Sequence, residues 1–292
     1  IFTPTMTLLS ILAIITALAT TMPMAGQTLD EDFDRLDKTL GMAADYVAAH
    51  ESKTSAIREL LDSRNASPAE AYDLYGSLFR AEYTFRFNSA IEALEHKAEA
   101  ALALKDPSRI SVTNVEKSTL FCIAGMYLES MQAAAQIDTA CLDSRQMIAF
   151  YYFQQRFNSD FREFSQNSED RASMFSKTNY YRTRIIEETD ASSSLHRLME
   201  VRILIDEGCL HEADSVSILA LGSLNPESHD YAELAYWEGT ICRETGRWDE
   251  MMQWFARSAV SDIKSATKDN ASLQTIAIEL LNADRDIERA FR

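Results

Sequence analysis

The sequence predicts an all-α fold of stacked helical hairpins, preceded by one long helix. Three observations lead to this prediction. Only 8 Gly and 5 Pro occur in 292 residues, and such a scarcity of helix breakers favours long helices. A glycine-centred turn recurs along the chain, and apolar residues near the N-terminus alternate at spacings of three and four.

The recurring turn consists of Gly, a variable residue, a large apolar residue, another variable residue and Glu. It is found as GMYLE from Gly125, GCLHE from Gly208 and GRWDE from Gly246. Glycine permits the left-handed turn that ends one helix, and the acidic residue favours the start of the next. Three copies in register are typical of tetratricopeptide-like (TPR) repeats, so we expect a TPR-like helical-hairpin solenoid.

The repeats align on the residue at which the two helices of a hairpin cross. This residue falls at Ala90, Ser130, Ala213, Met251 and Ala290. The interval between the second and third of these positions is about two periods, so a degenerate repeat is expected between Asp138 and Asp190. Within it, the polar stretch from Asn167 to Ser176 is interpreted as a loop.

The first repeat helix has a clear start. Ser67 is a helix cap, Pro68 suits the first helical position, and Glu70 completes a capping box. Residues 67–292 are therefore assigned to the TPR-like repeats. Because the chain stops soon after the last crossing position, we interpret this region as truncated at its C-terminal end.

A heptad seam precedes the repeats, in residues 27–66. This segment predicts one long helix from about Leu29 to Asp62 and a short linker. The seam has two interpretations: it packs on the first repeat, or it pairs with a second copy and makes a homodimer through Phe33–Leu61. Its apolar and small positions are Phe33, Leu36, Leu40, Ala43, Val47, His50, Thr54, Ile57 and Leu61.

Residues 1–26 contain no charged side chain and include a continuous apolar run from Thr7 to Ala19. The run is shorter than the roughly 20 residues that a spanning helix needs, which favours a signal peptide; an uncleaved N-terminal anchor is the alternative. Either interpretation predicts export, and thus a periplasmic location.

The four cysteines show no metal-binding spacing and lie in apolar helical patterns, which favours small buried side chains. Export would permit a disulfide. Cys209 and Cys242 occupy similar places in successive repeats and are the pair to test.

Composition excludes some functions. The net charge is −17 and the sequence pI is about 4.7, so no nucleic-acid binding can rest on these residues. The sequence contains no nucleophile elbow, zinc-protease, Walker or dinucleotide motif, and its five His are scattered. We therefore expect no enzyme activity, no metal and no cofactor.

A binding site is expected on the concave face, which the first helix of each hairpin lines. Aromatic side chains with flanking charges suit a protein or peptide partner, or a glycan. The alternative is that these side chains pack helices together or face water. Counting from the Gly turns gives Arg202, Asp206, Tyr236, Arg243 and Glu244, and the aromatic run Phe150 to Phe157 adds Tyr151 and Tyr152.

The order of these segments, with the C-terminal stretch SAVSDIKSATKDNASLQTIAIELLNADRDIERAFR, resembles a known family. It is similar to the membrane-anchored TPR regulators of Bacteroidota that carry a domain of unknown function (DUF6377). The most specific stretches are Leu36 to Leu61, Ser67 to Ala90 and Ala259 to Phe291. The chain departs from the repeat consensus at Met251, which replaces Ala, and at Arg285, which replaces the turn Gly.

The resemblance implies exported repeats followed by one transmembrane helix and a cytoplasmic helix-turn-helix, and some members are thought to control polysaccharide-utilisation genes. This chain would then be a fragment without those later parts, tethered to the inner membrane in the full-length protein. Its function would be that of a non-catalytic sensor or interaction domain. A free periplasmic TPR adaptor or scaffold is the alternative, and the coding sequence beyond Arg292 distinguishes the two.

Overall fold

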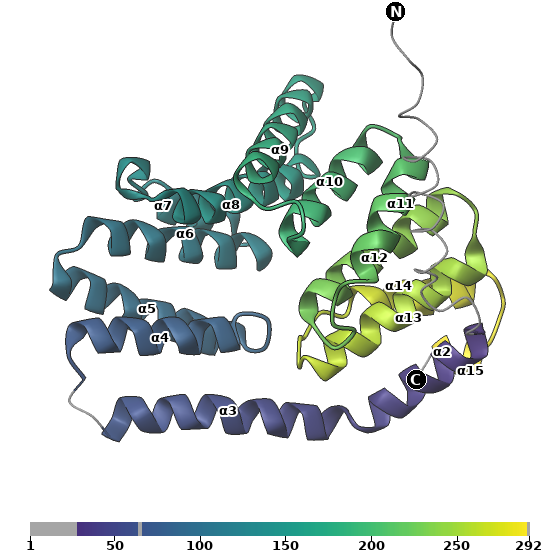
Figure 1. Cartoon of the computed structure of the whole chain (residues 1–292), viewed down its shortest axis with the longest axis horizontal. Helices are drawn as coiled ribbons and strands as arrows, with labels where there is room; N and C mark the ends of the chain where they lie inside the picture. Colours follow the sequence, from purple (N-terminus) through teal and green to yellow (C-terminus); the bar gives the residue numbers. More distant parts are fainter. Residues whose placement is uncertain (1–27, 64–65, 291–292) are drawn as a thin grey trace, which may run out of the picture.

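The computed structural model describes residues 28–63 and 66–290, and these ranges are helical without strands. The fold class predicted from the sequence is confirmed. The helices, labelled as in Figure 1, are α2 (Leu29–Gly41), α3 (Ala43–Ser63), α4 (Pro68–Glu82), α5 (Phe87–Leu104), α6 (Pro107–Ile123), α7 (Tyr127–Ala134), η1 (Thr139–Cys141), α8 (Ser144–Arg162), α9 (Ser168–Glu188), α10 (Ser194–Asp206), α11 (Leu210–Leu221), α12 (His229–Glu244), α13 (Trp248–Lys264), α14 (Ala271–Asn282) and α15 (Ile287–Ala290).

Successive helices pack as antiparallel hairpins, α4 with α5, α6 with α7, and so on to α14 with α15. The hairpin of α8 and α9 is the degenerate repeat expected between Asp138 and Asp190. The small residues predicted at the helix crossings are buried where the hairpin closes, since Ala90, Ser130 and Ala213 are 0% exposed. Met251, which replaces the usual Ala, is also accommodated in the core at 1% exposed.

The glycine turns have the conformation that the sequence predicts. Gly125, Gly208 and Gly246 have φ of 73°, 76° and 73°, in the left-handed region that side chains with a Cβ disfavour. The last turn carries Arg285 where the alignment of the repeats expects the glycine, and the positive φ falls instead on its two neighbours, Asp284 at 51° and Asp286 at 39°. Asp tolerates the left-handed region better than most residues, so the hairpin still closes.

The polar stretch from Asn167 to Ser176 is helical from Ser168 onward, so its interpretation as a loop is wrong. Asn167 caps α9 by accepting a hydrogen bond from the backbone N–H of Glu169 at 2.9 Å. The helix buries only Thr178, Arg182 and Ile185. A helix with so narrow a buried face has a polar sequence, which is why its first turns resemble a loop.

The long N-terminal helix is formed over nearly the predicted range, but Met42 divides it into α2 and α3. Met42 has φ −101° and ψ 3°, and its N–H donates to the Thr39 carbonyl in a tighter turn. Gly41 immediately precedes the break, and glycine is among the weakest helix formers. Because Gly41 and Met42 are exposed, little packing opposes the change of direction.

The heptad seam is covered by the same chain, at both ends of the repeat stack. Phe33 and Leu36 of α2 join the core formed with α12 and α13, whereas Ile57 and Leu61 of α3 pack against the first hairpin. Figure 1 shows α3 running along one edge of the molecule from α4 to α2, which lies beside α13. The two ends of the seam are thus buried without a second chain, whereas Leu40 between them is 36% exposed, and the homodimer stays a prediction.

Ion pairs hold α2 and α3 to the repeats at both ends of the stack. At the far end, Asp32 of α2 is 1% exposed and accepts two hydrogen bonds from Arg257 of α13, at 3.0 and 2.8 Å. At the near end, Arg58 of α3 donates to buried Glu82 of α4 at 2.8 Å. Both charges of the Asp32–Arg257 pair are desolvated, so this pair fixes a contact geometrically even where its net free energy is small; Arg58 is 38% exposed, and only the Glu82 carboxylate of its pair is buried.

The loop within the first hairpin also contacts the loop that follows the α12–α13 hairpin. The backbone N–H of Lys268, after α13, donates to the carbonyl of Thr84, after α4, at 2.8 Å. The Lys268 ammonium lies 4.5 Å from the ring centroid of Phe85. The repeat stack therefore closes on itself instead of ending as an open superhelix, and the first helices of the hairpins face inward.

The segment predicted as signal peptide or anchor, residues 1–26, lies outside the described residues. Within the described part of the chain, no helix is both long enough and apolar enough to cross a membrane. The four cysteines are free thiols, so the Cys209–Cys242 pair is not joined in this structure.

Candidate functional site

Polar and aromatic residues from hairpins far apart in the sequence gather on the inner side of the closed stack. We call this group the inner polar cluster; it comprises Tyr83, Tyr152, Arg156, Arg202 and Glu233. Tyr83 ends α4, while the other members lie on α8, α10 and α12. Glu233 and Arg156 act on the pKa of Tyr83, Tyr152 and Arg202, so the five residues share one electrostatic environment.

Arg202 is the most deeply buried member of the cluster. Its side chain is 6% exposed, its Nη1 donates to Gln155 Oε1 at 3.3 Å, and its guanidinium lies 4.9 Å from the ring centroid of Trp237. Burial lowers the pKa of Arg202, and the negative charge of Glu233 partly opposes this. The Nε of Arg202 has no hydrogen-bond partner among the described residues, which marks a donor that a ligand could satisfy.

The two tyrosines supply hydroxyl groups. The charge of Glu233 and then burial raise the pKa of Tyr152, and burial followed by the neighbouring Tyr152 raises the pKa of Tyr83. Both phenols are half-buried and stay protonated at neutral pH, so both remain hydrogen-bond donors. Arg156 is held by Asp160, with Nε and Oδ2 2.6 Å apart.

A second polar network, around Arg182, adjoins the inner polar cluster next to Arg202. Arg182 of α9, 2% exposed, donates to Asp206 Oδ2 at 2.6 Å, to Asn179 Oδ1 at 3.2 Å and to Gln155 Oε1 at 3.4 Å. Burial, and then the positive charge of Arg202, lower the pKa of Arg182 to about 10. Gln155 bonds to both guanidinium groups, so it fixes Arg182 and Arg202 relative to each other.

The residues predicted from sequence divide between this site and other places. Arg202 and Tyr152 lie in the inner polar cluster, whereas the carboxylate of Asp206 pairs with Arg182 behind it. Tyr151 stacks on Tyr181, with ring centroids 6.0 Å apart.

The remaining predicted residues lie along α12. The Tyr236 ring packs at 5.4 Å from that of Phe255 on α13, and so contributes to helix packing. Arg243 and Glu244 are exposed at the C-terminal end of α12. None of these three residues makes a described contact with a member of the inner polar cluster.

Three members of the cluster escaped the sequence analysis: Tyr83, Arg156 and Glu233. Arg156 lies one helical turn after Tyr152, so helical spacing alone could have indicated it. Tyr83 could not have been found in this way, because only the closure of the stack brings the end of α4 to α8 and α12. The charge of Glu233 also acts on His229, whose pKa is raised by its contact with Asp262 at 3.5 Å.

Within residues 28–63 and 66–290, no group of His, Cys, Asp and Glu is arranged to hold a metal ion. The cluster offers hydrogen-bond donors, one carboxylate and aromatic surface. Helical hairpins that present such side chains on an inner face define the TPR class of repeat domains, which generally mediate interactions.

Comparison with protein families places the chain more specifically. The family described as "SusR N-terminal TPR domain" matches residues 40–292, and the chain belongs to this family. The match includes α3 and every hairpin, and thus all members of the inner polar cluster. No curated protein and no solved structure matches the chain.

Proposed function

We propose that this chain is the sensing or interaction domain of an exported, membrane-anchored transcription regulator, and that it binds its ligand or partner without catalysis at the inner polar cluster. The observation that carries this proposal is the buried Arg202 guanidinium, whose Nε has no partner among the described residues although three hairpins contribute to its surroundings. Desolvated, incompletely paired polar groups are uncommon in proteins and often belong to binding sites.

The chemistry of the cluster suits a peptide or a glycan. The hydroxyls of Tyr83 and Tyr152 and the guanidinium of Arg202 donate hydrogen bonds, and the Glu233 carboxylate accepts them. Trp237, which stacks on Arg202, adds a flat apolar surface of the kind that sugar rings and peptide side chains contact. Because the contributing hairpins meet only in the closed stack, occupancy of the site would be sensitive to how the hairpins are arranged.

The binding part of the proposal is tested by thermal-shift screening of the full chain against oligosaccharides and short peptides. Hits are then titrated by calorimetry against Glu233→Gln and Tyr152→Phe, which change the cluster with little change in volume. Tyr180→Phe is the control, because Tyr180 is 58% exposed on α9. Loss of affinity in the two cluster variants alone supports the site, whereas equal affinity in every variant contradicts it.

The regulatory part is tested independently by reading the coding sequence beyond Arg292. About 20 apolar residues followed by a helix-turn-helix domain support a membrane-anchored regulator. A stop codon soon after Arg292 contradicts it and favours a free periplasmic adaptor that binds a protein partner through the same cluster.

A further inference from the structure

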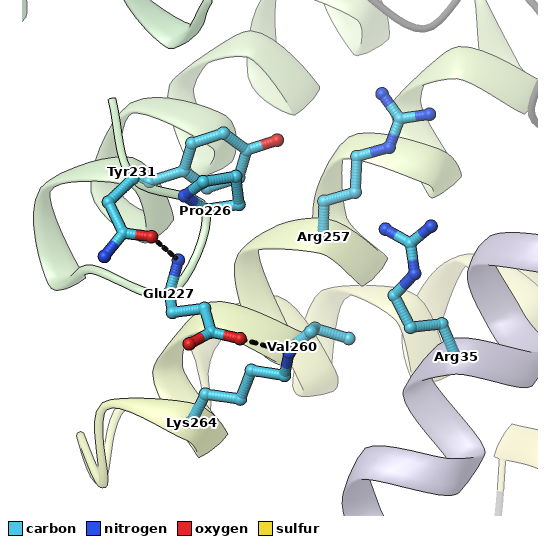
Figure 2. Close-up of a pocket in the computed structure, with 8 residues that line it drawn as sticks. Arg35, Pro226, Glu227, Tyr231, Arg257, Val260 and Lys264 are labelled. Carbon is cyan, nitrogen blue, oxygen red and sulfur yellow. Dashed lines mark hydrogen bonds and ion pairs between the residues drawn. The ribbon is translucent and has the colours of Figure 1, made fainter. Parts of the chain in front are cut away.

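A pocket lies where α2 crosses the last complete hairpin, and it is separate from the inner polar cluster. Arg35 of α2 forms one side, and Tyr231 with the loop before α12 forms the other (Figure 2). Arg257, Val260 and Lys264 of α13 complete the lining. The pocket has a volume of about 340 Å³, a size that fits a small molecule.

Positive charge prevails in this pocket. Arg257 donates through Nε and Nη2 to one oxygen of Asp32, which leaves Nη1 for a second acceptor. Arg35 contacts Asp32 only at 3.8 Å and its side chain is 39% exposed, so its guanidinium is weakly held. Lys264 is paired with Glu227 at 2.7 Å. Three cations thus face two carboxylates, in a chain whose net charge is −17.

The opposite wall combines the apolar surfaces of Pro226 and Tyr231 with the polar side chains of Asn225 and Glu227, and the Tyr231 phenol adds a hydroxyl donor. Pro226 and Tyr231 face the arginines across the pocket, with Val260 beside them (Figure 2). Burial raises the pKa of Tyr231, although the charge of Arg257 opposes this, so the phenol stays protonated at neutral pH. Figure 2 shows the Tyr231 hydroxyl pointing toward the side occupied by Arg257. It can therefore donate to the same acceptor as the guanidinium groups.

We propose that this pocket binds a small organic monocarboxylate. Its carboxylate would lie between Arg35 and Arg257, where the excess of one positive charge matches a monoanion, and guanidinium groups bind carboxylates with favourable geometry. Its apolar body would pack on Pro226, Tyr231 and Val260. Because Arg35 belongs to α2, such a ligand connects the N-terminal helix to the last hairpin. This site does not depend on the function proposed for the inner polar cluster.

The test is calorimetric titration of the full chain with benzoate, with the neutral analogue benzamide and with inorganic phosphate. We expect benzoate to bind, benzamide not to bind and phosphate to bind more weakly. Arg35→Gln should weaken benzoate binding roughly tenfold or more, because it removes a charge-assisted contact. Arg145→Gln, an exposed arginine on α8, is the matched control and should bind as the unmodified chain does.

Three results would overturn the proposal: no heat with benzoate, equal binding of benzamide, or unchanged affinity in Arg35→Gln. Phosphate that binds as tightly as benzoate would overturn the role of the apolar wall. Circular dichroism melting of Arg35→Gln verifies that the variant is folded. Arg257 and Asp32 are left unchanged in this test because their buried ion pair also stabilises the fold.

Discussion

Replacement of Glu238 by Gln should stabilise the protein at alkaline pH and have little effect near pH 5. Glu238 lies on α12 and is 0% exposed. Burial, and then the neighbouring Asp214, raise its pKa from an ordinary value of 4.5 to about 8. Arg247 lies 3.7 Å away but makes its closer ion pair with Asp214. The Glu238 carboxyl is thus protonated in the folded protein at neutral pH.

The sign and size of the effect follow from proton linkage. A carboxyl whose folded pKa is raised contributes its full stability below pH 4.5 and loses it as the pH rises through about 8. Since one pKa unit corresponds to about 1.4 kcal/mol, ionisation of Glu238 costs up to about 5 kcal/mol at pH 9. Water penetration and relaxation reduce such costs, so we expect Glu238→Gln to recover about 2 to 5 kcal/mol there.

Urea unfolding followed by circular dichroism at pH 5, 7 and 9 measures this gain. Glu250→Gln is the matched control, because its side chain is 52% exposed and pairs with the same arginine, Arg247. The control should show no gain that grows with pH. If Glu238→Gln is no more stable than the unmodified chain at pH 9, the carboxyl is not held neutral by burial and the reasoning is refuted.

Three further variants test the packing of two glycines and the Asp32–Arg257 ion pair, and each is measured by its urea midpoint at neutral pH. Gly239→Ala should destabilise the protein by roughly 1–3 kcal/mol, because its Cβ would lie 2.8 Å from Cε1 of the buried Phe255 ring. Gly222→Ala, whose Cβ would approach no atom closer than 3.6 Å, should instead stabilise by about 0.5 kcal/mol; equal effects of the two would contradict the close approach. Asp32→Ala should lower the free energy of unfolding by about 3–5 kcal/mol, because it leaves the Arg257 guanidinium buried without its partner. A decrease of less than about 1 kcal/mol would show that this ion pair does not hold α2.

Closure of the stack gives the N-terminal helices a role beyond burying a heptad seam. α2 and α3 tie the α12–α13 hairpin to the first hairpin, and the Lys268–Thr84 hydrogen bond joins the same two parts of the stack. A ligand at the inner polar cluster would therefore act on hairpins whose mutual positions the N-terminal helices restrain. We therefore expect ligand binding at the inner polar cluster and the position of α2 to affect each other.

The candidate site could be predicted only in part. Helical spacing within one hairpin indicated Arg202, which lies in the inner polar cluster, because its position relative to the Gly208 turn is a local property. The same counting placed Tyr236 on that face, although its ring packs between the helices of its own hairpin. Counting residues along a helix gives the direction of a side chain only approximately. This uncertainty is large enough to assign a residue that packs between helices to the binding face.

The sequence by itself determined the helical hairpins, their glycine turns and the burial of the heptad seam. These depend on φ preferences and apolar periodicity, which act over a few residues. The tertiary structure alone decided what covers the seam: Asp32 meets Arg257 across 225 residues of sequence. That contact depends on small rotations between successive hairpins, which accumulate until the stack closes, and no local pattern in the sequence encodes their sum.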